Sequence, residues 1–81
     1  MARRAADVDA QARFGANLRA CRQAAEMSQE RLAFASGMHR TEISLLERGA
    51  RDPRLSTVSR LALALGKDSS ELVAGIVPPD E

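Results

Sequence analysis

The sequence predicts an all-α fold, a compact bundle of five short helices. Fifteen alanines and nine leucines, both strong helix formers, carry most of the 44% apolar fraction. The strand-favouring types, valine, isoleucine, threonine, tyrosine, phenylalanine and tryptophan, total ten residues and never alternate convincingly along the chain. A length of 81 residues is below the usual domain size, so we expect one domain with one small core.

The first predicted helix spans residues 13–25. Phe14, Leu18 and Cys21 recur at spacings of four and three, which is the pattern of a helix buried on one face. We expect Cys21, the only cysteine, to be a small apolar core residue, because a single thiol forms neither an internal disulfide nor a multi-thiolate metal site. Residues 1–12 lack a strong apolar stripe, so we expect a flexible arm or a frayed helix there.

A second helix of two turns follows, with Ser28 as its N-cap and with Leu32 and Ala33 on its inner face. The small side chain of Ala33 suits a point where two helices cross at a steep angle. The helix stops before Gly37, which we expect to adopt a positive φ in a tight turn.

A third helix is predicted over about 40–48. Ile43 and Leu46 form its inward pair. His39 is placed to cap the first turn, together with Glu42 three positions later. The polar loop that follows contains a proline, which cannot continue a helix.

Two more helices complete the predicted bundle. Ser56 is expected to cap the fourth helix, ahead of a clear apolar stripe. Asp68 and Glu71 have the spacing of a capping box at the start of a short fifth helix. Two adjacent prolines mark the end of the ordered structure. The folded domain is therefore predicted to span residues 13–77, and residues 78–81 are predicted to form a disordered tail.

Composition argues against several classes of protein. No apolar run approaches the roughly 18 residues that a membrane span needs, and no signal peptide follows the first methionine, so we expect a cytoplasmic protein. One cysteine, one histidine and no glycine-rich phosphate loop leave no pairing of nucleophile and base. We therefore expect no enzyme, no metal site, no cofactor and no small-molecule ligand.

The outward side of the third helix carries residue types that read DNA. Arginine can take both acceptors of guanine, serine and threonine contact bases or phosphates, and leucine packs on a thymine methyl group. Eleven of the twelve basic residues are arginine, although composition bias explains this equally well, and a pI near 8.0 is too low for charge alone to decide. The outward set is Arg40, Thr41, Ser44, Leu45 and Arg48.

Four phrases of the sequence, MSQERLA, SGMHRTEISLLERG, P-x-L-S-T-V and LALALG, together resemble the Cro/repressor type of helix-turn-helix, also called the XRE family. The resemblance covers roughly residues 14–73 and implies a lambda-repressor-like fold. It also implies a sequence-specific regulator of transcription that binds double-stranded DNA. The segment HRTEIS is similar to the corresponding segment of controller proteins of restriction-modification systems.

The resemblance implies a role for each matching position. A glutamine at the start of the second helix contacts a phosphate, or is only a polar first-turn residue. The first exposed positions of the third helix contact bases, and the next two lie deeper in the groove, where a leucine here replaces a polar residue. Positions beyond them clamp the backbone, or are solvated surface. The implied DNA contacts are Gln29, Arg40, Thr41, Ser44, Leu45, Arg48, Arg51 and Thr57.

Three further residues have predicted roles beside the DNA contacts. Arg22 and Glu47 match a buried pair that joins the first and third helices in this family, so their role is structural. Glu42 either caps its own helix, which we favour, or accepts a hydrogen bond from cytosine N4.

The leading hypothesis is a transcriptional regulator that acts as a homodimer on a palindromic operator, with the helix at 40–48 in the major groove. The predicted dimer interface is Leu72, Val73, Ile76 and Val77, unless all four complete the monomer core. The alternative hypothesis is a protein-interaction module, such as an antitoxin or an adaptor, that uses the same fold.

Overall fold

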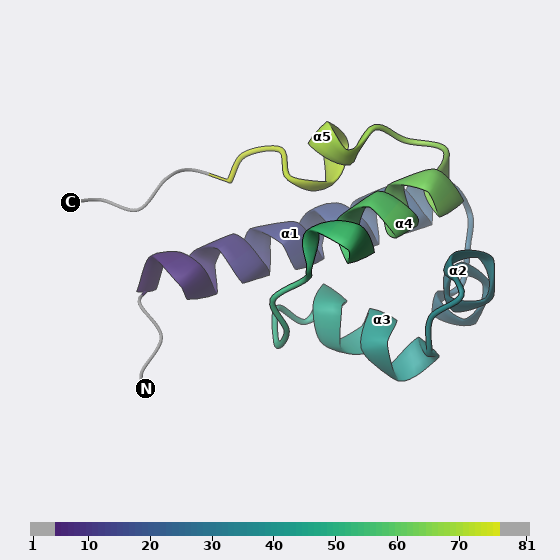
Figure 1. Cartoon of the computed structure of the whole chain (residues 1–81), viewed down its shortest axis with the longest axis horizontal. Coiled ribbons are helices and arrows are strands. Elements are labelled where there is room, and N and C mark those ends of the chain that lie inside the picture. Colours follow the sequence, from purple (N-terminus) through teal and green to yellow (C-terminus); the bar gives the residue numbers. More distant parts are fainter. Residues whose placement is uncertain (1–4, 77–81) are drawn as a thin grey trace.

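Five helices and no strand form within residues 5–76, the part of the chain that the computed structural model describes. The predicted all-α fold is therefore confirmed. Figure 1 shows α1 as the longest helix, with α3 and α5 packed against it, while α2 packs on α3 and α4. The helices are α1 (Ala5–Ala24), α2 (Gln29–Ser36), α3 (Arg40–Glu47), α4 (Leu55–Leu65) and α5 (Ser69–Leu72).

The first helix begins at Ala5 and not at Arg13, where the apolar pattern predicted its start. Tertiary contact is the reason. Gln11 is only 3% exposed, and Gly49, just after α3, lies so close that a Cβ on it would be 3.0 Å from the Cα of Ala12. The contact involves a glutamine and a small alanine, which do not form an apolar stripe, so the pattern of apolar residues does not reveal it.

The end of α1 also depends on a conformation that the sequence does not signal. Glu26 has φ 57°, in the left-handed region that glycine usually occupies. The backbone N–H of Met27 donates to the carbonyl oxygen of Arg22 at 3.1 Å, so this turn satisfies a helix-end acceptor. The first helix thus turns sharply into α2 without a glycine.

The pair of helices α2 and α3 forms as predicted. The side-chain oxygen of Ser28 accepts from the backbone N–H of Arg31 at 3.0 Å, and Leu32 and Ala33 are buried. Gly37 has φ 69° and leads into α3. Local residue chemistry is sufficient here, because the cap and the turn each lie next to the helix end that they control.

The caps of α3 and α4 differ from the prediction. His39 occupies the N-cap position of α3, but its side chain makes no capping hydrogen bond, and Glu42 pairs with another residue. The N-cap of α4 is Arg54 and not Ser56, because the helix begins at Leu55, two residues before the start that a cap at Ser56 implies. The first backbone N–H groups of both helices therefore lack a side-chain partner from their N-cap residue.

The start of α5 is confirmed. Asp68 and Glu71 form the predicted capping box. The Asp68 side chain accepts from the backbone N–H of Glu71, and the Glu71 side chain accepts from the backbone N–H of Asp68. The helix ends at Leu72, whose side chain is 0% exposed. Leu72 therefore belongs to the monomer core, the alternative that the sequence left open, and offers no surface to a second chain.

One hydrophobic core lies between all five helices. Cys21 sits at its edge and is half-buried rather than enclosed. No helix within residues 5–76 has the length and apolar character needed to cross a membrane. The core residues are Phe14, Leu18, Leu32, Ala33, Ile43, Leu46, Val58, Leu61, Ala62, Leu65 and Leu72.

Gly15 allows a close contact between the backbones of α1 and α3. A Cβ on Gly15 would lie 2.7 Å from the carbonyl oxygen of Glu47 and still closer to that of Leu46. Both neighbours are backbone atoms, which cannot rotate away as a side chain can. The last turn of α3 is therefore seated directly on the backbone of α1.

Candidate nucleic-acid interface

A buried ion pair fixes the inner side of α3, as the sequence predicted. The Arg22 Nε donates to Glu47 Oε2 at 2.6 Å and its Nη2 donates to Oε1 at 3.0 Å. The two side chains are only 12% and 4% exposed. The remaining guanidinium nitrogen, Nη1, donates to the carbonyl oxygen of Met27 at 2.8 Å. The pair thus joins α1, α3 and the turn before α2 in one network.

The guanidinium of Arg22 is held firmly in its charged form. Its pKa is raised, first because Glu47 accepts its hydrogen bonds, while partial burial acts in the opposite direction and the charge of Glu47 adds to the increase. Arg22 is therefore a stable cationic partner for Glu47. Because the pair is nearly enclosed, losing one partner would leave the other charge without compensation.

Gln29 points inward. Its Nε2 donates to Glu47 Oε1 at 3.1 Å, so α2 joins the same network. The phosphate contact predicted for this residue stays a prediction, and within the protein its side-chain amide already has a structural partner. The backbone N–H of Gln29 remains at the N-terminal end of α2, where an anion is favoured.

The outer side of α3 is open to solvent. Arg40 is 63% exposed in its side chain and lies 4.0 Å from Glu30, while Thr41 is also exposed. Ser44 and Leu45 are half-buried, and the exposed Arg48 donates from Nε to the carbonyl oxygen of Ser44 at 3.3 Å. Four of the five residues predicted to read DNA therefore lie along one side of the eight-residue α3, opposite the buried Ile43 and Leu46, and the fifth, Arg48, is its C-cap residue.

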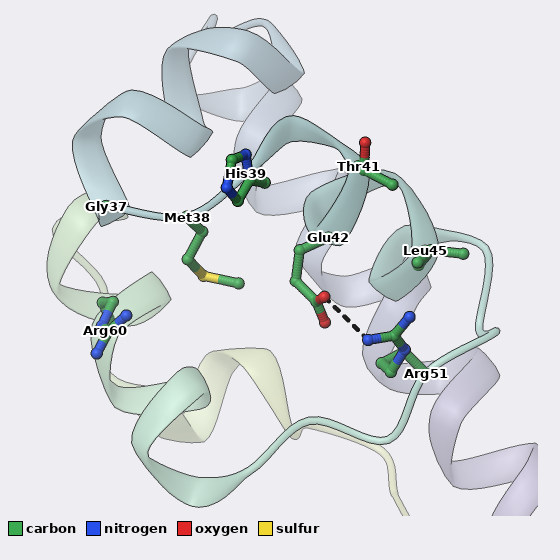
Figure 2. A pocket seen from close by; sticks show the side chains of 8 residues that line it. All are labelled: Gly37, Met38, His39, Thr41, Glu42, Leu45, Arg51 and Arg60. Carbon is green, nitrogen blue, oxygen red and sulfur yellow. Dashed lines mark hydrogen bonds and ion pairs between the residues drawn. The ribbon is translucent and has the colours of Figure 1, made fainter.

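The flank of α3 carries a second ion pair. Arg51, in the loop after α3, donates from Nη1 to Glu42 Oε1 at 3.0 Å. Figure 2 shows the Glu42 side chain reaching along the helix flank to Arg51, while Thr41 points away from both. This contact corrects the prediction that Glu42 caps its own helix: the carboxylate is drawn to a nearby cation and not to the backbone of the first turn.

Two shallow surface pockets meet at this ion pair. The first has a volume of about 400 Å³ and lies between α3 and α4, with Met38 and Leu45 as apolar lining and His39 and Arg60 at its edge (Figure 2). The second, of about 340 Å³, lies over the loop after α3. It is lined by Glu42, Arg51, Asp52, Pro53, Arg54 and Thr57.

The second pocket brings together two residues predicted to clamp the DNA backbone, Arg51 and Thr57, and adds one that the sequence analysis missed. Arg54 lines this pocket and is the N-cap residue of α4, although its side chain makes no capping hydrogen bond. The signal was present as the second arginine of RDPR, but the predicted cap at Ser56 placed Arg54 in the preceding loop. Arg60, on α4, was also not predicted.

The predicted dimer interface is divided by the structure. Leu72 is buried in the core, Val73 is 42% exposed, and Ile76 is half-buried against the core. Val77 lies outside the described residues. The exposed part of the predicted surface is therefore smaller than the sequence indicated.

Two short helices joined at a glycine turn, the second with a buried anchor inside and arginine, threonine and serine outside, define a helix-turn-helix protein. A family model described as helix-turn-helix, HTH_3, matches residues 18–72. The chain belongs to this family and is a DNA-binding transcriptional regulator, as the resemblance implied.

Relatives of known name agree with this assignment. The chain is 41% identical over 61 residues to the control protein C.BamHI of Bacillus amyloliquefaciens, covering 74% of this chain and 75% of that protein. It is 44% identical over 57 residues to the control protein C.SmaI of Serratia marcescens, covering 70% and 68%. The crystal structure of the restriction-modification controller protein C.AhdI from Aeromonas hydrophila superposes with a TM-score of 0.75 at 42% identity, over 76% of this chain and 94% of that one.

Proposed function

We propose that the protein acts as a homodimer on a palindromic operator and, like the controller proteins that it resembles, regulates a restriction-modification system. Each subunit places α3 in the major groove of one half-site. The observation that carries this proposal is the arrangement of α3, whose inner side is fixed by Glu47 and whose outer side exposes Arg40 and Thr41 to solvent, Arg40 in a long, exposed ion pair with Glu30. A rigid helix with a polar, exposed outer side suits base reading.

Arg40 and Thr41 are proposed to read bases, because they stand in the first turn of α3 and project from the protein surface. A guanidinium can bind both major-groove acceptors of guanine, which gives Arg40 the larger share of specificity. Ser44 and Leu45 lie further along the same side and are proposed to contact the next bases, with Leu45 against a thymine methyl group. Arg48 is proposed to hold the adjoining backbone.

The loop after α3 and the start of α4 are proposed to clamp one phosphate of the DNA backbone. Arg51, Arg54 and Thr57 line the same pocket, and α4 begins beside it, at Leu55, without a side-chain cap from Arg54. Two guanidinium groups, a hydroxyl and a helix N-terminus all favour a phosphate. Gln29 is proposed to contribute its backbone N–H only, since its side chain is bound to Glu47.

Pairing of two subunits is proposed because one such module makes a small interface with DNA, about 600–1,000 Å² for comparable units. Two-fold symmetry then requires half-sites whose centres lie about 10–10.5 base pairs apart, or a multiple of this. Val73 and Ile76 are proposed to take part in the dimer contact, and Val77 is proposed with them. The proposal involves binding alone, with no catalytic step.

Selection of bound sequences from a random duplex library tests this proposal. The purified protein should enrich a short palindrome, the mass of the complex should correspond to two chains, and affinity should fall steeply as salt rises. The palindrome should occur beside the genes of a restriction-modification system in the source genome. If no sequence is enriched and binding stays at the nonspecific level, the proposal fails and the protein-interaction module becomes the better hypothesis.

Two arginine variants separate base reading from backbone clamping. Arg40→Ala should weaken operator binding by about 1–3 kcal/mol and relax the preference at one base pair, whereas Arg51→Ala should weaken binding to all sequences similarly. Arg19→Ala, which removes an exposed arginine from α1, is the control for loss of charge alone. Equal losses on operator and random DNA for Arg40→Ala would make that residue a backbone contact.

A further inference from the structure

The exposed ion pair between Glu42 and Arg51 places a negative charge beside the surface that must approach DNA phosphates. Arg51 Nη1 lies 3.0 Å from Glu42 Oε1, and the side chains are 50% and 32% exposed. The pair forms the shared wall of the two pockets on either side of it. Of the described residues, these two alone line both pockets.

Stability does not explain this pair. Exposed ion pairs contribute little to folding, because solvent screens their attraction and holding two long side chains in one geometry costs entropy. The Glu42 carboxylate does not cap α3 either. Its physical effect is on Arg51, whose guanidinium it orients and whose charge it partly neutralises.

We propose that Glu42 is a positioning residue that makes the protein more selective for its operator, by restraining Arg51. This inference rests on the proposed function, since it concerns how Arg51 meets a phosphate. One hydrogen bond to Glu42 leaves the other donors of the guanidinium available. A phosphate held at one fixed place can therefore bind Arg51 while Glu42 keeps its own contact.

Operator and random DNA differ in whether the phosphate that Arg51 contacts stays at one fixed position. On the operator, base contacts from α3 hold the register, so the phosphate meets an arginine that is already oriented and loses little entropy. On random DNA the protein slides, and Arg51 must leave Glu42 to follow the phosphates. The pair thus lowers affinity for random DNA more than affinity for the operator.

Glu42→Gln tests this inference, because it preserves the size of the side chain and removes the charge. Affinity for random duplex should rise about two- to fivefold, the range that an exposed ion pair represents. The salt dependence on random duplex should steepen by about 0.9 in the slope of log K against log salt, as for one added phosphate contact. Operator affinity should change less, so the ratio of operator to random affinity should fall.

Two further variants show whether the effect passes through Arg51. Asp52→Asn is the matched control, because Asp52 is an exposed acid beside Arg51 in the same pocket and forms no ion pair within residues 5–76. It should raise affinity for both DNAs alike and leave their ratio unchanged. In an Arg51→Ala background, Glu42→Gln should no longer alter the ratio.

The inference is overturned if Glu42→Gln leaves the ratio at the wild-type value, if it behaves like Asp52→Asn, or if its effect on the ratio persists without Arg51. These results would leave the proposed function intact, since wild type would still discriminate. A wild-type protein that binds both DNAs equally would instead overturn the proposed function and this inference with it. An unchanged melting temperature establishes that each variant is folded.

Discussion

The inner and outer sides of α3 each carry a glutamate paired with an arginine, but the two pairs serve different purposes. On the inner side Glu47 is 4% exposed and accepts from Arg22 and from Gln29. On the outer flank Glu42 is 32% exposed and accepts one hydrogen bond from Arg51. Burial is the difference, because an enclosed pair cannot exchange its partner for water or phosphate.

This comparison shows how the eight-residue α3 can be held rigidly on its inner side and still be available to bind DNA on its outer side. The enclosed pair, together with the close contact at Gly15, holds the helix on α1. The open pair can lend its arginine to a ligand at small cost. Residue type alone does not separate the two cases, since both are glutamate with arginine.

The largest expected effect is on the enclosed pair. Glu47→Ala should destabilise the fold by about 3–5 kcal/mol, because the buried Arg22 charge loses its partner. Chemical denaturation monitored by circular dichroism measures this. Glu30→Ala, at an acid 80% exposed in its side chain, is the control and should change little. A midpoint for Glu47→Ala equal to that of wild type would show that the inner pair is not structural.

The contact at Gly15 should give the next largest effect. Gly15→Ala should destabilise by about 1–3 kcal/mol, since the new methyl group meets the carbonyl oxygens of α3 and forces the helices apart. The sign is informative, because alanine in a helix is otherwise about 1 kcal/mol more favourable than glycine. Gln23→Ala, on the exposed part of α1, is the comparison. A rise in the denaturation midpoint for Gly15→Ala would contradict the close approach.

The smallest expected effect is on the open pair. Glu42→Gln should change stability by about 1 kcal/mol or less, because both partners are well exposed to solvent. Thermal denaturation at low and at high salt measures this, and any difference from wild type should shrink as salt rises. A loss as large as that for Glu47→Ala would mean that the two pairs are not different in kind.

Much of the fold was predictable because its signals are local. The Ser28 cap, the Gly37 turn and the Asp68 to Glu71 capping box each act within a few residues of the helix end that they define. The buried pair of Arg22 and Glu47 was predicted in a different way, from resemblance to a family. The spacing of 25 residues between them contains no signal of contact.

The wrong predictions concern positions where a distant segment decides the outcome. The side chain of Glu42 had the spacing of a cap, but its carboxylate accepts from Arg51, nine residues away, at 3.0 Å. Ser56 had the residue type of a cap, but α4 begins at Leu55, two residues before the start that a cap at Ser56 implies.

By itself, the sequence determined the helical class, the short helices around the glycine turn, and the outward set of DNA-reading residue types on α3. These follow from propensity, periodicity and capping, which depend on neighbours along the chain. Only the tertiary structure decided that Leu72 is buried in the core and that α3 packs closely on Gly15. It also decided which acid forms an ion pair with Arg22 and which with Arg51. Those outcomes depend on distances between segments far apart in sequence, and no local pattern records such distances.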